Sequence, residues 1–155
     1  MLDLLFKGGW VIDGLGAPMY RADVGVENGT ISAVGDLGEA EAVRTIDCEG
    51  LCISPGWVDI HSHADWSVLE HSIGLNLLIQ GCTLTVAGNC GGSPAPMQGR
   101  ATAILERGEM RRTVTTEMMQ QRYPSGRWSA ANLLAEIEKE RPGINYVQLV
   151  GHNQL

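Results

Sequence analysis

The sequence predicts an α/β protein in which a small β-domain precedes parallel strands connected by helices. Short strand-like segments separated by turns fill the first 50 or so residues. From Leu51 onward, apolar strand-like segments alternate with helix-like segments. This alternation is typical of parallel sheets and barrels, in which a helix crosses from each strand to the next.

In the β-domain, strands are expected over residues 2–6, 10–12, 23–26 and 30–34. Asn28-Gly29 lies between the last two, and this dipeptide is a strong hairpin signal because both residues tolerate the positive φ of a type I′ turn.

The α/β part begins with an apolar strand over residues 52–60. A helix is expected over residues 67–80, where Leu69, Ile73, Leu77 and Leu78 recur at helical spacing. A second strand follows at residues 83–87, and the Gly- and Pro-rich stretch after it predicts a shaped loop over residues 88–96.

Two further helices are candidates over residues 100–111 and 115–122, before a turn at residues 123–126. Ser129 is a good N-cap for a helix over residues 130–140, whose apolar stripe is Leu133, Leu134 and Ile137.

The third strand, residues 145–150, is expected to be fully buried. Since a barrel needs eight strands and roughly 250 residues, we interpret the chain as the front part of a longer protein.

Composition excludes several classes of function. The chain has 155 residues, 18 acidic against 11 basic side chains and a net charge of −7, without a Lys/Arg cluster, so nucleic acid is not an expected partner. No basic leader and no membrane-length apolar run are present, and we expect a cytoplasmic protein without a membrane partner. Four cysteines without CxxC spacing favour free thiols or a metal ligand over disulfides, and Cys48 and Cys52 are expected to be ordinary core or strand residues.

His61 and His63 close the first apolar strand of the α/β part. Residues i and i+2 of a strand share a face, so two imidazoles can point at one metal ion. On spacing alone, a hydrogen-bonded structural pair of histidines is an equally good interpretation. The strand context and the neighbouring Asp59 and Asp65 favour the metal.

Cys90 and His152 follow the second and third strands, so both are expected at the same edge of a parallel sheet as the His pair. Imidazole and thiolate are good zinc ligands. The residues alone nevertheless leave simpler interpretations open: Cys90 as a small side chain that fits a Gly-rich turn, and His152 as a packing residue. Asn89, Gly91 and Gly92 are equally explained by tight turns, and His71 is expected at the surface.

Residues 55–63, Pro-Gly-Trp-Val-Asp-Ile-His-Ser-His, resemble the metal-binding motif of the amidohydrolase superfamily. Together with residues 81–86, 88–91 and 93–96, the pattern resembles one branch in particular, the D-aminoacylases or N-acyl-D-amino-acid deacylases. The final Gly-His-Asn-Gln-Leu, residues 151–155, is similar to a segment after the third strand in that branch.

The resemblance implies a fold and a set of ligands. Residues 1–53 would form an N-terminal β-domain, part of a composite β-sandwich, and residues 54–155 the first three strands of a TIM-like (β/α)8 barrel, incomplete in this chain. Cys90 would be a zinc ligand, and His61 and His63 would hold a second metal position, giving one or two zinc ions. A supporting or substrate-side role is implied for a further set, Asp59, Asp65, Asn89, Ser93 and His152.

The activity that the resemblance implies is hydrolysis of the amide of an N-acyl-D-amino acid, a small-molecule substrate, to a carboxylate and the D-amino acid. The aspartate that acts as general base and acid in the family is expected beyond Leu155, so the chain alone should not catalyse. Ser62 and Ala64 stand where relatives more often have Thr and an acidic residue, and the second difference changes the hydrogen bonding available near the ligands.

Two alternatives remain. A cyclic-amide hydrolase of the dihydroorotase or hydantoinase type generally uses a carboxylated lysine in place of the loop cysteine, so Cys90 discriminates against it. The other alternative is a truncated remnant without catalysis, whose open strand edges would favour aggregation.

Overall fold

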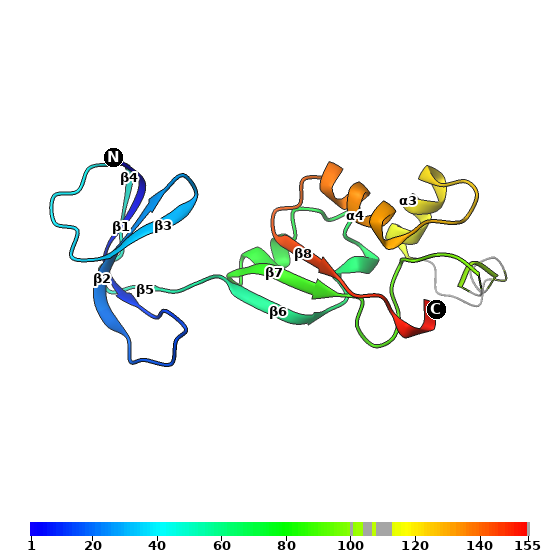
Figure 1. Cartoon of the computed structure of the whole chain (residues 1–155), viewed down its shortest axis with the longest axis horizontal. Helices are drawn as coiled ribbons and strands as arrows, with labels where there is room; N and C mark the ends of the chain where they lie inside the picture. Colours follow the sequence, from blue (N-terminus) through cyan, green and yellow to red (C-terminus); the bar gives the residue numbers. More distant parts are fainter. Residues whose placement is uncertain (100, 104–106, 108–112, 155) are drawn as a thin grey trace. The chain divides into compact units, whose positions relative to one another are not determined.

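The computed structural model describes residues 1–99, 101–103, 107 and 113–154, and the chain divides into two compact units, Met1–Pro55 and Gly56–Leu155 (Figure 1). Strands make up the first unit, and the second alternates strands with helices, as the sequence predicts. Within the described ranges, no helix is long and apolar enough to span a bilayer.

The first unit is a five-stranded mixed sheet. Its strands are β1 (Leu2–Val11), β2 (Tyr20–Glu27), β3 (Thr30–Gly35), β4 (Ala42–Asp47) and β5 (Cys52–Ile53). They follow the order β3-β2-β1-β4, and β5 pairs with the end of β1. β2 is antiparallel to β1 and β3, whereas β4 and β5 run parallel to β1. A small core of Val11, Ala22 and Val24 packs with Phe6 and Ile53.

The hairpin predicted at Asn28-Gly29 is confirmed, since both residues have positive φ, 52° and 73°, between β2 and β3. The two strands predicted over residues 2–6 and 10–12 are one strand, β1, with an irregularity between Phe6 and Gly9. Here Gly8 has a φ of 74° and donates its N–H to Asp23 Oδ1 at 2.7 Å, so the glycines form a bulge and not a turn. β4 was not predicted because most of its side chains are exposed and give no apolar alternation.

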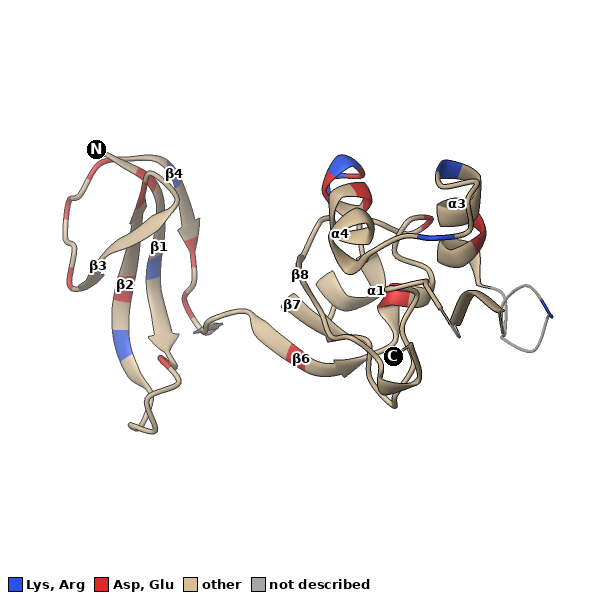
Figure 2. Cartoon of the chain, turned by 45° about the vertical axis from the view of Figure 1, so that its right-hand side comes forward, with Lys and Arg blue, Asp and Glu red and all other residues tan. Residues whose placement is uncertain are grey.

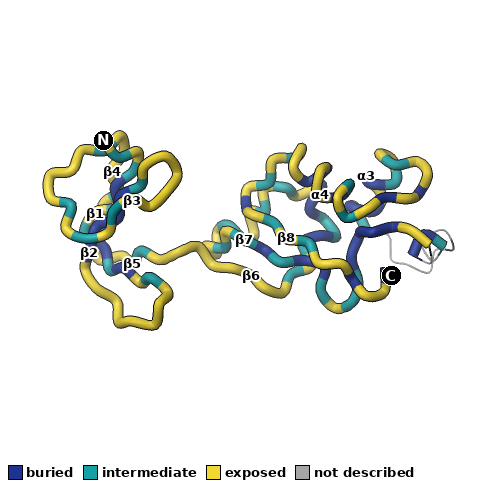
Figure 3. The backbone as a smooth tube through the Cα atoms, viewed as in Figure 1, coloured by how far each residue is buried: buried dark blue, intermediate teal, exposed yellow. Residues whose placement is uncertain are grey.

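The second unit contains three parallel strands, β6 (Trp57–Ser62), β7 (Cys82–Ala87) and β8 (Asn145–Gln148), in the order β6-β7-β8. The middle strand contributes the buried Thr85 and Ala87, while the two edge strands are largely exposed or half-buried (Figure 3). Parallel strands in sequence order confirm the predicted α/β arrangement, and they bring the carboxyl ends of all three strands to one edge.

Helices α3 (Val114–Arg122) and α4 (Ala130–Lys139) form much of the core of this unit. Ser129 caps α4 as predicted: its Oγ accepts the Asn132 N–H at 3.1 Å, and Asn132 Oδ1 accepts the Ser129 N–H at 2.9 Å. The buried cluster comprises Val68, Leu69, Ala95, Met97, Ala101, Met119, Trp128, Leu133 and Ile137. Leu134, the third member of the predicted stripe, is 41% exposed.

Charged residues lie at the C-terminal ends of α3 and α4 (Figure 2). The carboxylate of Glu136 accepts hydrogen bonds from Arg122 at 2.8 Å, Lys139 at 2.7 Å and Tyr123 at 3.2 Å. The hydrogen bond from Lys139 outweighs the opposing effect of burial and, with the charge of Lys139, the hydrogen bond from Tyr123 and the charge of Arg122, lowers the pKa of this carboxyl below its ordinary value.

Three further predicted elements were wrong in extent. The strand predicted over residues 52–60 is divided into β5 and β6, which belong to different sheets, because Pro55 between them has no N–H to donate. The helix predicted over residues 67–80 is reduced to α1 (Leu75–Leu78), since Gly74 adopts a left-handed φ of 63° and turns occupy the preceding residues.

The third error concerns the strand predicted over residues 145–150. β8 ends at Gln148, and Val147, Leu149 and Val150 are 42–46% exposed because β8 is an edge strand of the described sheet. The helix predicted over residues 115–122 is confirmed as α3. Of the helix predicted over residues 100–111, residues 101–103 are helical. Apart from residue 107, the other positions lie outside the described residues.

Candidate metal centre

His61 and His63 lie at the carboxyl end of β6. His61 is the penultimate residue of the strand, and His63 is the N-cap of a short 3-10 turn, η1 (Ala64–Trp66). The two imidazole centroids are 5.9 Å apart, with an angle of 69° between the ring planes. Both side chains are exposed, so they are available to a ligand.

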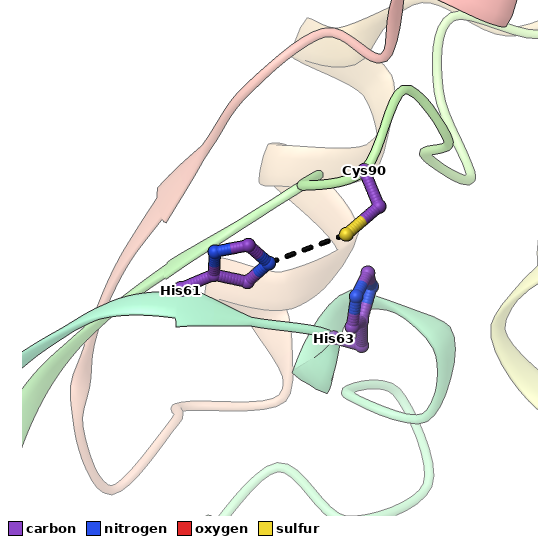
Figure 4. A group of neighbouring side chains, drawn as sticks. All are labelled: His61, His63 and Cys90. Carbon is purple, nitrogen blue, oxygen red and sulfur yellow. Dashed lines mark hydrogen bonds between the residues drawn. The ribbon is translucent and has the colours of Figure 1, made fainter.

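Cys90 reaches the two histidines from the loop after β7. His61 Nε2 and Cys90 Sγ are 3.3 Å apart, and the nearest ligand atoms of His61, His63 and Cys90 all lie within 4.8 Å of one another (Figure 4). Cys90 has a φ of 56°, which an L-residue with a Cβ seldom adopts. The loop therefore holds a strained backbone at the residue that directs its sulfur toward the imidazoles.

This donor set fits a zinc ion. A tetrahedral zinc with Zn–N near 2.0 Å and Zn–S near 2.3 Å separates its ligand atoms by roughly 3.3–3.6 Å. The 3.3 Å between His61 Nε2 and Cys90 Sγ is close to the nitrogen–sulfur value of about 3.5 Å, and all three ligand atoms lie within 4.8 Å of one another. Two imidazoles and one thiolate would leave the fourth position open, as in catalytic zinc sites.

Asn89 connects the two segments that contain these residues. Its Nδ2 donates to Ser62 O at 3.1 Å and to Val86 O at 2.9 Å. Ser62 lies between the two histidines, and Val86 is at the end of β7. One amide thus holds β6 and β7 together directly beside Cys90.

We call His61, His63 and Cys90 the metal group. The two aspartates near the histidines are not members of it. Asp59 accepts the backbone N–H of His61 at 3.1 Å and so supports the main chain of this candidate ligand. Asp65 is fully buried in η1, and burial raises the pKa of its carboxyl despite the nearby Gln148 amide and His63. Its Oδ1 has no hydrogen-bond partner among the described residues.

Ser93 is buried and His152 is exposed. Ser93 is fully buried, and its Oγ accepts the Gly151 N–H at 3.0 Å, which connects the loop after β7 to the segment after β8. His152 begins the short turn η2 (His152–Gln154), is exposed, and is outside the metal group. The following residue, Asn153, donates its N–H to Gly91 O at 2.8 Å, so the backbone after β8 supports the Cys90 loop and the imidazole of His152 does not.

Sequence reasoning missed Gln148 and Tyr146. On β8, the Tyr146 hydroxyl donates to Gln148 Oε1 at 2.7 Å, and Gln148 Nε2 contacts Asp65 Oδ2 at 3.4 Å. The one available signal was the i, i+2 spacing of two polar side chains in a strand expected to be fully buried.

As predicted, His71 is at the surface, with 70% of its side chain exposed, and all four cysteines are free.

Comparisons with known proteins show the same relatives by sequence and by structure. The chain is 41% identical to an N-acyl-D-glutamate deacylase and 33% identical to an N-acyl-D-aspartate deacylase, both from Alcaligenes xylosoxydans xylosoxydans, over 99% of its length. Over 61% of its length it is 44% identical to a D-aminoacylase from the same organism. No family model matches the chain. The chain spans 29% of the length of the two deacylases.

The similar solved structures are of the same kinds of enzyme as the relatives found by sequence. The N-acyl-D-glutamate deacylase of Bordetella bronchiseptica, complexed with zinc and a phosphonate inhibitor that mimics the tetrahedral intermediate, superposes with a TM-score of 0.76 at 36% identity. A D-aminoacylase described as defining a subset of amidohydrolases gives 0.77 at 35% identity. These matches cover 97–98% of this chain and 30% of those chains.

Proposed function

The chain belongs to the D-aminoacylase branch of the amidohydrolase superfamily, whose N-terminal portion it matches, and on this basis we propose that it contributes a zinc site to an enzyme that hydrolyses N-acyl-D-amino acids. The observation that supports this most strongly is the convergence of His61, His63 and Cys90 from two different strand ends on one point.

The three side chains would act as ligands of one or two zinc ions. A bound zinc ion would supply Lewis acidity, which polarises the acyl carbonyl of the substrate and lowers the pKa of the attacking water molecule. The chain's own contribution is to hold two imidazoles and a thiolate at an exposed edge of the sheet, where a small substrate can approach. In keeping with the family resemblance, we propose that the general base comes from another part of the enzyme.

An acyclic N-acyl-D-amino acid is the substrate class that the relatives favour over a cyclic amide. The similarity to the N-acyl-D-glutamate and N-acyl-D-aspartate deacylases extends over 99% of the chain. By contrast, the similarity to D-hydantoinase covers 59% of the chain, and the similarity to dihydroorotase covers 40%. The proposed domains follow the same relatives: residues 1–53 as part of a β-sandwich, and residues 54–155 as the start of a TIM-like barrel.

We place the enzyme in the cytoplasm, since the four cysteines of this chain are free thiols, as is usual in a reducing compartment. Its partner there would be the small N-acyl amino acid. A net charge of −7 argues against nucleic acid as a partner.

A chimera tests the proposed function. The N-terminal portion of the Alcaligenes N-acyl-D-glutamate deacylase is replaced by this chain, which spans 29% of it, and the purified chimera is assayed with N-acetyl-D-glutamate and N-acetyl-L-glutamate. We expect zinc-dependent hydrolysis of the D-enantiomer, abolished by Cys90→Ser in the transplanted part. A folded, zinc-loaded chimera that hydrolyses dihydroorotate or hydantoin instead, or no amide, would contradict the proposal.

A further inference from the structure

Gln148 lies at a junction between β8 and the turn that follows His63. Its Nε2 donates to Leu149 O at 2.7 Å and, over a longer distance of 3.4 Å, to Asp65 Oδ2. Its Oε1 accepts the hydroxyl hydrogen of Tyr146 at 2.7 Å. Both the nitrogen and the oxygen of the amide therefore have hydrogen-bond partners. One partner is the fully buried carboxylate of Asp65, two residues beyond the candidate ligand His63.

Gln148 also lies against the turn that leads to Cys90. A Cβ built on Gly88 would be 2.6 Å from Gln148 Nε2 and 2.1 Å from Leu149 O, so the backbone at position 88 is in direct contact with the end of β8. The Leu149 N–H donates to Ala87 O at 2.8 Å and completes this contact. One side chain of β8 thus touches both segments that contain the candidate ligands.

We propose that Gln148, oriented by Tyr146, is a positioning residue for the metal centre. Through Asp65 it fixes the turn that starts at His63, and through its packing on Gly88 it fixes the approach of the loop to Cys90. Gln148, Tyr146 and Asp65 lie outside the group of candidate ligands, His61, His63 and Cys90. This inference rests on the proposed function, because it assumes that His61, His63 and Cys90 bind zinc.

Geometry explains why an amide is suited to this position. A single amide group offers a donor to the Asp65 carboxylate and an acceptor to the Tyr146 hydroxyl at the same time. Methionine has a similar length but can do neither. Loss of such outer contacts in metalloproteins typically weakens metal affinity by about 10- to 100-fold.

The test measures zinc affinity of the 155-residue chain by competition with a chromophoric chelator, together with the absorption spectrum of its Co(II) complex. For Gln148→Met we expect affinity about 10- to 100-fold weaker and an altered thiolate-to-cobalt charge-transfer band. Tyr146→Phe removes only the hydroxyl and should weaken binding in the same direction by less. Gln80→Met is the matched control, because the Gln80 amide bonds to Asn76 O on α1 and to no other described residue, and it should leave both measurements unchanged.

The outcomes separate this inference from the proposed function. Wild-type chain that binds no zinc overturns both. Wild-type chain that binds zinc, with Gln148→Met and Tyr146→Phe of equal affinity and identical cobalt spectra, overturns the positioning role alone. A variant whose apo stability falls while zinc affinity does not change also overturns it, since that result shows a merely structural role. If Gln148→Met does not fold, Tyr146→Phe decides by the same criteria.

Discussion

His61 Nε2 lies 3.3 Å from Cys90 Sγ although 29 residues separate them in the chain. The two residues meet because β6 and β7 are parallel neighbours, so that both chain segments leave the sheet at the same edge. The strained φ of Cys90 and the amide of Asn89 then fix the sulfur beside the imidazole.

Replacing Cys90 by Ser should remove the thiolate from this group. We expect the zinc affinity of the chain to fall by at least about 100-fold, because even loss of contacts outside the ligand set costs 10- to 100-fold. Cys52→Ser is the matched control: Cys52 is also a free, exposed cysteine, and it is outside the metal group. Equal zinc affinity of the two variants, measured by chelator competition, would show that Cys90 is not a ligand.

Gly88→Ala tests the close approach between the loop and β8. The added Cβ would be 2.1 Å from Leu149 O, at a φ of 87° that disfavours L-residues, so we expect loss of more than about 1 kcal/mol of unfolding free energy. Gly99→Ala imposes a similar positive φ, 55°, and no atom of the described residues lies within 4 Å of the new Cβ. Urea denaturation should therefore show a larger loss for Gly88→Ala, and equal losses would contradict the close contact.

Asn89→Ala removes the amide that joins Ser62 O and Val86 O. Two hydrogen bonds are lost, and we expect the unfolding free energy to fall by about 1–3 kcal/mol. The amide hydrogen exchange of β6 and β7 should become faster in the same variant. Asn76→Ala, on the exposed helix α1, should change neither quantity. Unchanged stability of Asn89→Ala would mean that other contacts hold the two strands together.

The Glu136 carboxylate predicts a pH dependence of stability. Its pKa is lowered in the folded state, so the stabilisation is fully present above the ordinary Glu value of 4.5 and is lost as the pH falls through the lower, folded pKa. At pH 7, Glu136→Gln should cost about 1.5–3 kcal/mol, the value for hydrogen bonds to a charged group. Urea titrations should show that the difference from wild type shrinks in acid, and a difference that grows in acid would contradict this assignment.

Much of the fold could be predicted from local sequence patterns. The Asn28-Gly29 turn and the Ser129 cap each depend on a few neighbouring residues, and both are confirmed. The parallel order of the strands follows from the alternation of strands and helices. β4 and the extent of α1 could not be predicted, because exposed strand residues give no apolar period and because the left-handed Gly74 interrupts a helical pattern.

The candidate site was partly predictable for the same reason. The i, i+2 histidines and a cysteine after the next strand predict convergence once the strands are known to be parallel. Gln148 and Tyr146 could not be found this way, since their roles depend on contacts across the sheet to Asp65 and Gly88. His152 shows the opposite case: a chemically suitable residue at a strand end whose side chain lies outside the metal group.

Zinc K-edge X-ray absorption of the 155-residue chain loaded with one equivalent of zinc tests directly whether His61, His63 and Cys90 bind one ion. We expect one sulfur at about 2.3 Å and nitrogen ligands at about 2.0–2.1 Å, with the outer-shell scattering of two imidazoles. In Cys90→Ser the sulfur contribution should disappear. A first shell without sulfur in the wild-type chain, or zinc lost on desalting, would contradict the claim that His61, His63 and Cys90 form one metal site.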